Sequence, residues 1–212
     1  MKIAILGTGN VGGALARVWT RKGHEIVFGT REPQSVKVQD LVANLGKRAK
    51  ADTPERAAQS CEVVVLATPW PAAQETLQSC GKLAGKLVLD CTNPLAPDLS
   101  GLSVAGNTSG GEQVAQWSGG APVFKSFNTT GAENMHRASE FALKPVMFYC
   151  GNDDAWRPTV GKLVEDAGFE AVDAGKLSSA RWLEPLGMLW IHSAYKAGLG
   201  TDWAFAVARR GK

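Results

Sequence analysis

The stretch KIAILGTGNVGGALARVW, residues 2–19, decides the fold of this 212-residue chain. It opens with the continuously apolar segment 3–6, which is typical of a strand buried on both faces of a parallel sheet. The glycine pattern GTGNVG follows at 7–12. Apolar residues then recur at helical spacing before Gly23: Val11, Leu15, Val18 and Trp19. Strand, glycine turn and helix in this order predict the start of a dinucleotide-binding βαβ unit.

Each glycine of the pattern has its own predicted role. Gly7 permits the tight turn, Gly9 lets the backbone approach a pyrophosphate, and Gly12 lets the helix close on the strand. The free N–H groups and the positive end of that helix would then face the phosphates. A tight glycine turn without a ligand is the alternative, and the position of the pattern directly after a buried strand disfavours it.

The rest of the chain alternates between short apolar runs and segments of helical period. Strands are expected at 25–28, 49–52, 62–67, 86–90, 122–127, 145–150 and 169–174. Helices are expected at 38–45, 70–80, 111–117, 155–167 and 179–197. This order predicts an α/β fold of the Rossmann-like, doubly wound kind, with a mostly parallel sheet and a helical C-terminal tail.

The chain is expected to form one domain, 1–212, with C-terminal helices from about 178 to 212 packed on it or on a second subunit. Pro185 and Gly187 predict a kink or break in the last helix. Ser109 and Glu112 predict a capping box at the start of an earlier one. Apolar residues of the tail follow helical spacing, and we expect them to pack on the sheet or on a second subunit, and secondarily to form the floor of an acceptor pocket: Trp182, Leu186, Leu189, Trp190 and Ala197.

The segment FGTRE, residues 28–32, follows the second predicted strand, where an NAD-binding protein often carries an acid for the adenosine ribose. Thr30 and Arg31 stand there instead, and they suit the 2′-phosphate of NADP, which a carboxylate would repel. Two such contacts, at about 1.5–3 kcal/mol each, would favour NADP over NAD by about two to three orders of magnitude. Glu32 is expected to face solvent or pair locally, and a surface arginine without a ligand is the alternative for Arg31.

Polar loops follow three of the predicted strands, at the edge of the sheet where ligands of open α/β folds bind. These loops are Thr68-Pro69-Trp70-Pro71, Cys91-Thr92-Asn93-Pro94 and Asn128-Thr129-Thr130-Gly131. Thr68 and Asn93 are therefore candidate cofactor contacts, although purely structural roles remain open for each loop. The loops contain no evident acid–base pair, and no Tyr-x-x-x-Lys motif occurs, because Leu199 and Asp153 stand four residues after the two tyrosines. We assign no catalytic residue and no metal ligand, and we favour direct hydride transfer between nicotinamide and a second redox cofactor.

Composition narrows the class of protein further. Hydrophobic residues make up 44% and charged residues 20%, as in globular proteins, and the net charge of +3 with no Lys/Arg run disfavours nucleic acid as a partner. The four scattered cysteines (Cys61, Cys80, Cys91 and Cys150) are expected to be reduced thiols of a cytoplasmic protein. No secretion signal and no membrane span are expected, since residues 1–2 lead directly into a strand and the apolar stretch 186–200 is too short.

The chain resembles the NADPH:F420 oxidoreductases, the family of F420-dependent NADP reductases. The resemblance rests on segments that follow the family's order: GTGNVGGALA, FGTRE, ATPWPAA, KSFNTTGAE, CGNDD, DAGKLSSARWLEPL and AGLGTDWAF. SFNTTGAE also looks like the cytosolic domain of STEAP-type metalloreductases, which pass hydride from NADPH to a flavin. The resemblance implies that a pyrophosphate lies on Thr8, Gly9, Asn10 and Val11, and the 2′-phosphate on Thr30 and Arg31. It further implies that Pro69 and Trp70 lie along the cofactor, and Asn128 near the nicotinamide.

The leading functional hypothesis is an NADP(H)-dependent oxidoreductase that exchanges hydride with F420 or another flavin-like acceptor, FMN or FAD. A second is an NADPH-dependent reductase of a small imine or carbonyl compound, with water or Thr129 relaying the proton. A third is a non-catalytic protein that senses NADP(H). We also expect a homodimer, because the apolar tail exceeds what one sheet needs to cover.

Overall fold

One eight-stranded sheet organises the protein, as seen in a computed structural model that describes residues 1–211. The strand order is β3-β2-β1-β4-β5-β6-β7-β8, and every neighbouring pair is parallel except β6 and β7. The strands are β1 (Lys2–Leu6), β2 (Glu25–Gly29), β3 (Ala49–Asp52), β4 (Val63–Leu66), β5 (Leu87–Asp90), β6 (Val123–Ser126), β7 (Val146–Gly151) and β8 (Glu170–Asp173). The predicted Rossmann-like fold with a mostly parallel sheet is confirmed.

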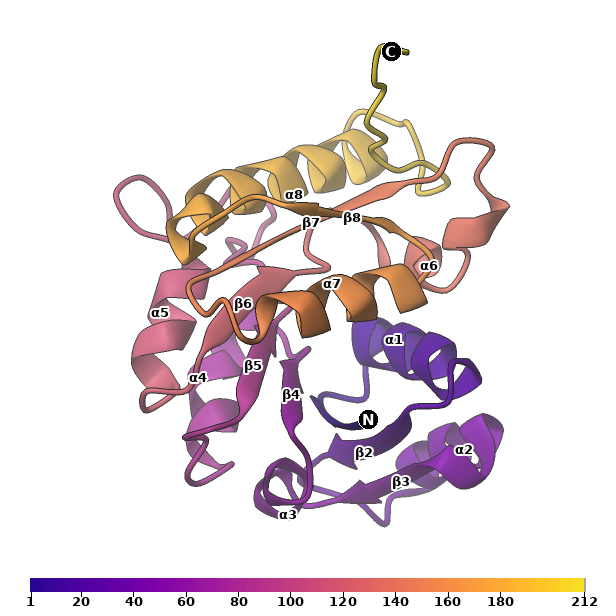
Figure 1. The fold of residues 1–212 in the computed structure, drawn as a ribbon, viewed down its shortest axis with the longest axis vertical. Coiled ribbons are helices and arrows are strands. Elements are labelled where there is room, and N and C mark those ends of the chain that lie inside the picture. The colour runs from indigo at the N-terminus through magenta and orange to yellow at the C-terminus, as the bar shows by residue number, and fades with distance from the viewer. Residues whose placement is uncertain (212) are drawn as a thin grey trace.

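Helices cover both faces of the sheet (Figure 1). They are α1 (Asn10–Arg21), α2 (Val36–Leu45), α3 (Pro54–Gln59), α4 (Trp70–Gln78), α5 (Gly110–Trp117), α6 (Ala132–Met135), α7 (Arg157–Asp166) and α8 (Ala180–Tyr195). Three 3₁₀ turns, Gly46–Arg48, Ala138–Glu140 and Leu177–Ser179, complete the elements. The sequence did not indicate α3 and α6, which have six and four residues and are too short for a helical period to be recognised.

The alternation of side chains along the central strands divides the core into two layers. Ile3 and Ile5 of β1 belong to the layer that α1, α6 and α7 cover. The alternate residues of the same strand, Ala4 and Leu6, belong to the opposite layer, which α3, α4, α5 and α8 cover. Apolar side chains are therefore required at every position of such a strand, which explains the continuous run that marked β1 in the sequence.

The last helix, α8, runs without interruption through Pro185 and Gly187, so the predicted break is wrong. Pro185 removes one backbone donor, but its ring lies on the exposed side of α8, while Leu183, Glu184 and Trp190 are buried and hold the helix on the protein. Only one of the two hydrogen bonds of the predicted capping box forms. Ser109 Oγ accepts from the Glu112 N–H at 3.2 Å, but the Glu112 carboxylate binds the Ser109 hydroxyl and Arg181 instead of the Ser109 N–H.

Residues 196–211 contain no helix and fold back over α6 and β7. The Val146 N–H donates to the Phe205 carbonyl at 2.8 Å, and Arg209 forms an ion pair with Glu170. Trp203 stacks on Trp190 of α8, with ring centroids 5.7 Å apart. The end of the chain thereby fastens α6, α8 and the edge of the sheet to one another.

Candidate functional site

Three cavities surround the glycine turn at the carboxyl edge of the sheet, where the strand order reverses between β1 and β4. We name them by one lining residue each. The Thr30 cavity measures about 290 Å³ and lies toward β2. The Trp70 cavity measures about 560 Å³ and lies toward β5, β6 and α8. The Arg17 cavity measures about 450 Å³ and lies between α1, α2 and α6.

Two of the three glycines in the turn, Gly7 and Gly12, are required by the fold itself, whereas Gly9 is not. Gly7 has φ +121°, and a Cβ there would lie 2.4 Å from the Ala67 carbonyl oxygen. A Cβ on Gly12 would lie 2.2 Å from the Gly7 oxygen. Gly9 has an ordinary φ of −81°, and a Cβ there would meet no protein atom within 4 Å. Its missing side chain leaves the uncapped N-terminus of α1 open, which is the geometry that an approaching phosphate needs.

Thr30 and Arg31 line the Thr30 cavity together with Thr8 and Thr68. Thr30 Oγ1 accepts from the Glu32 N–H at 3.4 Å, which leaves its own proton free to be donated. Arg31 is exposed and forms no ion pair within residues 1–211, and Glu32 is exposed as predicted. The structure thus brings a hydroxyl and an unpaired guanidinium to one cavity mouth.

The Trp70 cavity gathers the loops that follow β4, β5 and β6. All five residues predicted in these loops line it: Thr68, Pro69, Trp70, Asn93 and Asn128. Thr68 and Pro69 also line the Thr30 cavity. Its far wall comes from α8, through Trp190, Ile191 and Tyr195. For Trp190 the sequence indicated an acceptor pocket only as a secondary role, and Ile191 and Tyr195 were not predicted. Helical spacing identifies which residues share a face but not which sheet edge that face meets.

Asn93 and Asn128, which both line this cavity, form hydrogen bonds with each other. Asn93 Nδ2 donates to the Asn128 carbonyl at 2.7 Å, and Asn128 Nδ2 donates to Asn93 Oδ1 at 3.0 Å and to the Leu183 carbonyl at 2.9 Å. Phe127, directly before Asn128, has a left-handed φ of +58°, a costly conformation for an aromatic residue. Two buried oxygens here, Asn128 Oδ1 and Thr68 Oγ1, have no hydrogen-bond partner in the described chain. Buried polar atoms without partners are costly, so both fit a polar ligand.

A buried ion triad lies behind the cavity and was not predicted. Lys125 Nζ lies 2.7 Å from Asp90 Oδ2 and 2.8 Å from Glu184 Oε1. Burial alone would lower the pKa of Lys125, but the two carboxylates raise it above its usual value. Glu184 also accepts from the N–H groups of Gly110 and Gly111, both at 2.9 Å, which joins α8 to the positive end of α5. The lone lysine of the apolar run PVFKSF was the sequence signal for this triad.

Neither Thr129 nor Cys91 offers a reactive group to the Trp70 cavity. Thr129 is buried and its hydroxyl lies 3.5 Å from Met147 Sδ, outside all three cavities, so the suggested proton relay through Thr129 is wrong. Cys91 borders the Trp70 cavity, but burial, with a smaller effect of Asp90, raises the pKa of its thiol well above the ordinary range. A neutral thiol packs as a small apolar group.

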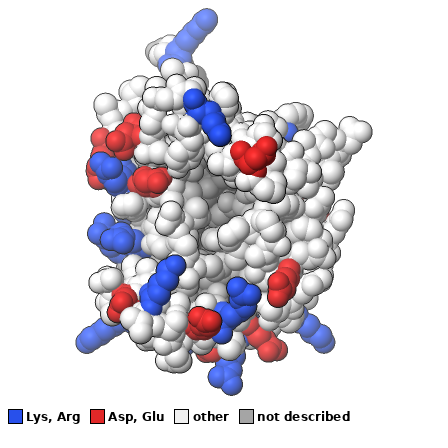
Figure 2. Space-filling view, turned by 180° about the vertical axis from the view of Figure 1, so that it is seen from behind, with Lys and Arg blue, Asp and Glu red and all other residues white. Residues whose placement is uncertain are grey.

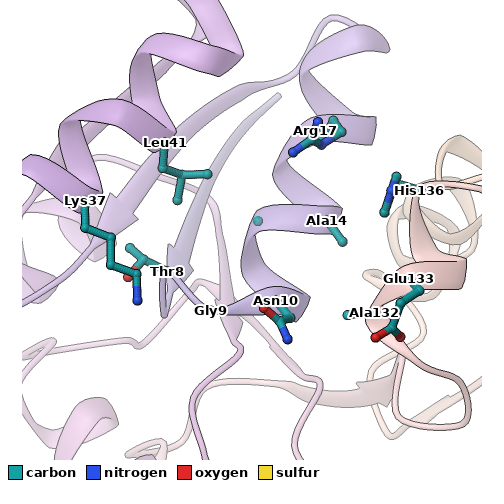
Figure 3. Close-up of a pocket in the computed structure, with 11 residues that line it drawn as sticks. Thr8, Gly9, Asn10, Ala14, Arg17, Lys37, Leu41, Ala132, Glu133 and His136 are labelled. Carbon is teal, nitrogen blue, oxygen red and sulfur yellow. The ribbon is translucent and has the colours of Figure 1, made fainter.

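The Arg17 cavity lies along the outer face of α1 (Figure 3). Thr8, Gly9 and Asn10 of the glycine turn form one end of it. The remaining lining residues were not predicted: Gly13, Ala14, Arg17, Lys37, Leu41, Ala132, Glu133 and His136. They come from three helical segments that are far apart in the sequence, so no local motif could identify them.

Residues 1–211 contain no cluster of three or more His, Cys, Asp or Glu side chains that could hold a metal ion. None of the helices described is long and apolar enough to cross a membrane. Figure 2 shows one face of the molecule with a central hollow and uncharged walls. Acidic and basic side chains are interspersed around it and form no continuous basic stripe.

The doubly wound sheet, the open N-terminus of α1 and the cavities on both sides of it define a Rossmann-type dinucleotide-binding protein. The profile of the family described as "NADP oxidoreductase coenzyme F420-dependent" matches residues 2–94. The F420-dependent NADP reductase of Methanothermobacter marburgensis is 29% identical over 206 residues, which cover 91% of this chain and 92% of that protein. Rat metalloreductase STEAP3 is 28% identical over 190 residues, and this chain spans 37% of its length.

A crystal structure from Arthrobacter sp. FB24, of a protein described as an F420-dependent NADP reductase, superposes with a TM-score of 0.89. The two proteins are 30% identical, and the match covers 99% of this chain and 100% of that one. The chain belongs to the F420-dependent NADP oxidoreductase family. It is an NADP-dependent oxidoreductase with NADP(H) as its cofactor.

Proposed function

We propose that this protein transfers hydride between NADP(H) and a flavin-like acceptor, with the deazaflavin F420 as the first candidate. The observation that carries the proposal is the composition of the Trp70 cavity. It adjoins the glycine turn through Gly9, Asn10 and Val11, and Glu133, Tyr195 and the neutral Cys91 are the only titratable side chains among its lining residues. Walls of this kind favour a flat redox partner that needs no protein acid or base.

The proposed cofactor site follows the edge of the sheet. NADP(H), when bound, supplies the hydride through its nicotinamide. Gly7, Thr8, Gly9, Asn10, Val11 and Gly12 would hold the pyrophosphate on the N-terminus of α1. The free donor of Thr30 and the unpaired Arg31 would hold the 2′-phosphate. Thr68, Pro69, Trp70, Asn93 and Asn128 would hold the nicotinamide end.

The chain's own contribution to the reaction is position and exclusion of water. The reciprocal Asn93–Asn128 hydrogen bonds and the unusual backbone of Phe127 fix the amides that would orient the nicotinamide. Trp70, which packs on Trp117 with ring centroids 5.3 Å apart, and Trp190 provide rigid aromatic walls. These walls would keep water from the two rings between which the hydride passes.

The proposal is tested by anaerobic mixing of the purified protein with NADPH and one acceptor at a time: F420, FMN or FAD. Loss of the NADPH absorbance together with reduction of the acceptor is expected for at least one of them. Tight NADPH binding without turnover of any acceptor would contradict the proposal.

Two side chains favour a second candidate, an NADPH-dependent reductase of a small imine or carbonyl compound. Tyr195 and Glu133 line the Trp70 cavity, and either could donate the proton that such a product requires. NADPH oxidation by a panel of ketones and cyclic imines tests this candidate. Activity that Tyr195→Phe or Glu133→Gln abolishes, with no flavin reduction, would favour it over the first.

We also propose that the chain forms one domain that acts as a homodimer in the cytoplasm. Trp182 and Leu189 are 72% and 52% exposed on α8, so the expectation that they pack on this chain's own sheet is not met. Together with Leu186 they form an apolar stripe at helical spacing, which supports a second subunit as their partner. The four free, buried cysteines support a reducing compartment. Light scattering that gives the mass of a monomer would contradict the dimer.

A further inference from the structure

The Arg17 cavity extends beyond what the nucleotide phosphates need. It starts at the glycine turn and continues along α1 past Gly13 and Ala14 to Arg17. Arg17 lies seven residues after Asn10 on α1, a rise of about 10 Å. A pyrophosphate on the N-terminus of α1 would occupy the first end and leave the far end, beside Arg17, for another group.

The cavity adjoins the Trp70 cavity. Gly9, Asn10, Ala132 and Glu133 line both, so a molecule seated against the nicotinamide can pass between α1 and α6 into the Arg17 cavity. In Figure 3, Asn10 at the start of α1 lies opposite Ala132 and Glu133 of α6.

The polar groups along this route differ from one end to the other. At the junction, Glu133 Oε2 is buried and accepts no hydrogen bond within the described chain, so it suits a ligand that donates, such as a hydroxyl. Arg17 and Lys37 are cations that form no ion pair within residues 1–211. His136, whose buried Nδ1 also lacks a partner, faces them from the α6 side. Along α1 the order is therefore a hydroxyl acceptor at the junction and the Arg17 cation beyond it, while Lys37 lies on the α2 side beside Thr8 (Figure 3).

We propose that the Arg17 cavity binds the arm of the hydride acceptor, and that this arm is a polyol ending in a phosphate. The inference rests on the proposed function, since it takes the ring of the acceptor to lie in the Trp70 cavity. Hydroxyls of the arm donate to Glu133, and the phosphate accepts from the Arg17 guanidinium, with Lys37 adding a second positive charge. The Glu133 carboxylate disfavours a phosphate at the junction itself and directs it to the far end.

FMN and riboflavin test the inference, because they share the ring and the ribityl hydroxyls and differ in the phosphate alone. Binding of each is measured by fluorescence titration to protein saturated with NADP⁺. We expect FMN to bind about tenfold tighter than riboflavin, and Arg17→Ala to remove about tenfold of FMN affinity without changing riboflavin or NADPH binding. Glu133→Gln should weaken both flavins alike. Arg21→Ala, an exposed arginine one turn further along α1 and outside the cavity, is the matched control and should change nothing.

Three results would overturn the inference. FMN and riboflavin could bind equally to the unaltered protein, or neither could bind, or Arg17→Ala could weaken NADPH as much as FMN, which would assign the cavity to the nucleotide. Failure of the proposed function is a separate result, because it is read from turnover of the acceptors rather than from their binding. A protein that binds FMN through Arg17 but reduces no acceptor would contradict the proposed function and leave the arm site intact.

Discussion

Lys125 Nζ lies 2.8 Å from Glu184 Oε1, and the two side chains are 0% and 1% exposed. This ion pair joins β6 to α8 directly behind the Trp70 cavity, and Asp90 of β5 completes it. Asp90 Oδ1 in turn accepts from the N–H and the hydroxyl of Thr92, which borders the cavity. The buried charges therefore hold together three of the elements that shape the Trp70 cavity.

Removing one member of the triad should be strongly destabilising. Glu184→Ala leaves the Gly110 and Gly111 donors unpaired and Lys125 with a single carboxylate, so we expect a loss of about 3–5 kcal/mol in the free energy of unfolding. Urea denaturation measures this loss. Arg181→Ala, which breaks the more exposed pair with Glu112, serves as the control and should cost much less. Equal losses for both variants would contradict the role assigned to the triad.

The two glycines of the turn should respond differently to the same change. Gly9→Ala places its Cβ in open space, so the unfolding free energy should fall by less than about 1 kcal/mol, while NADPH affinity falls about tenfold. Gly7→Ala combines a left-handed φ with a Cβ 2.4 Å from a carbonyl oxygen, and should cost about 3 kcal/mol in stability. Thermal unfolding and calorimetric titration separate the effects. A Gly9→Ala variant that binds NADPH normally would show that phosphate does not lie there.

Arg31→Ala should weaken NADPH binding about tenfold or more and leave NADH binding nearly unchanged, because only NADPH carries the 2′-phosphate. Calorimetry with both nucleotides measures the difference. The matched control is Arg56→Ala, at another exposed arginine near the same edge that does not line the Thr30 cavity. If Arg31→Ala reduced both affinities to the same extent, Arg31 would not distinguish the two nucleotides.

Acidification should destabilise the protein through Asp166. Burial would raise the pKa of this carboxyl, but hydrogen bonds from Lys162 and His24 outweigh burial and lower the pKa below its usual value. A lowered pKa in the folded state stabilises the protein above the unfolded pKa of about 3.9, and that stabilisation is lost as the pH falls through the folded value. Unfolding free energies at pH 7 and pH 3 should therefore differ more for the unaltered protein than for Asp166→Asn. The same difference in both would exclude Asp166 as the source.

The sequence predicted most of the fold because strands buried on both faces must be apolar at every position, as the runs in β1 and β4 are. It also predicted one side of the site, because residues that follow parallel strands, such as Thr68 and Asn128, necessarily meet at one edge. The other side could not be predicted in the same way. Glu133 and Tyr195 reach the cavity through the packing of α6 and α8, which depends on contacts distant in sequence rather than on a local motif.

Gly187 allows close packing of α8 and does not break the helix as predicted. The glycine suggested a weak point in the last helix, but a Cβ there would lie 2.5 Å from the Asn128 carbonyl oxygen and 3.0 Å from Asn93 Oδ1. It is small because α8 crosses the two asparagines at close range. Sequence alone does not distinguish a glycine that bends a helix from one that lets another chain segment approach.

The carbonyl oxygen of Trp203 accepts from Asn134 Nδ2 at 2.8 Å and from Trp190 Nε1 at 3.0 Å. One peptide group near the end of the chain thus ties α6 to α8, and both helices contribute residues to the wall of the Trp70 cavity. If an acceptor ring binds there as proposed, trimming or tagging the last residues of the protein would change which rings fit before it changed the affinity for NADP(H).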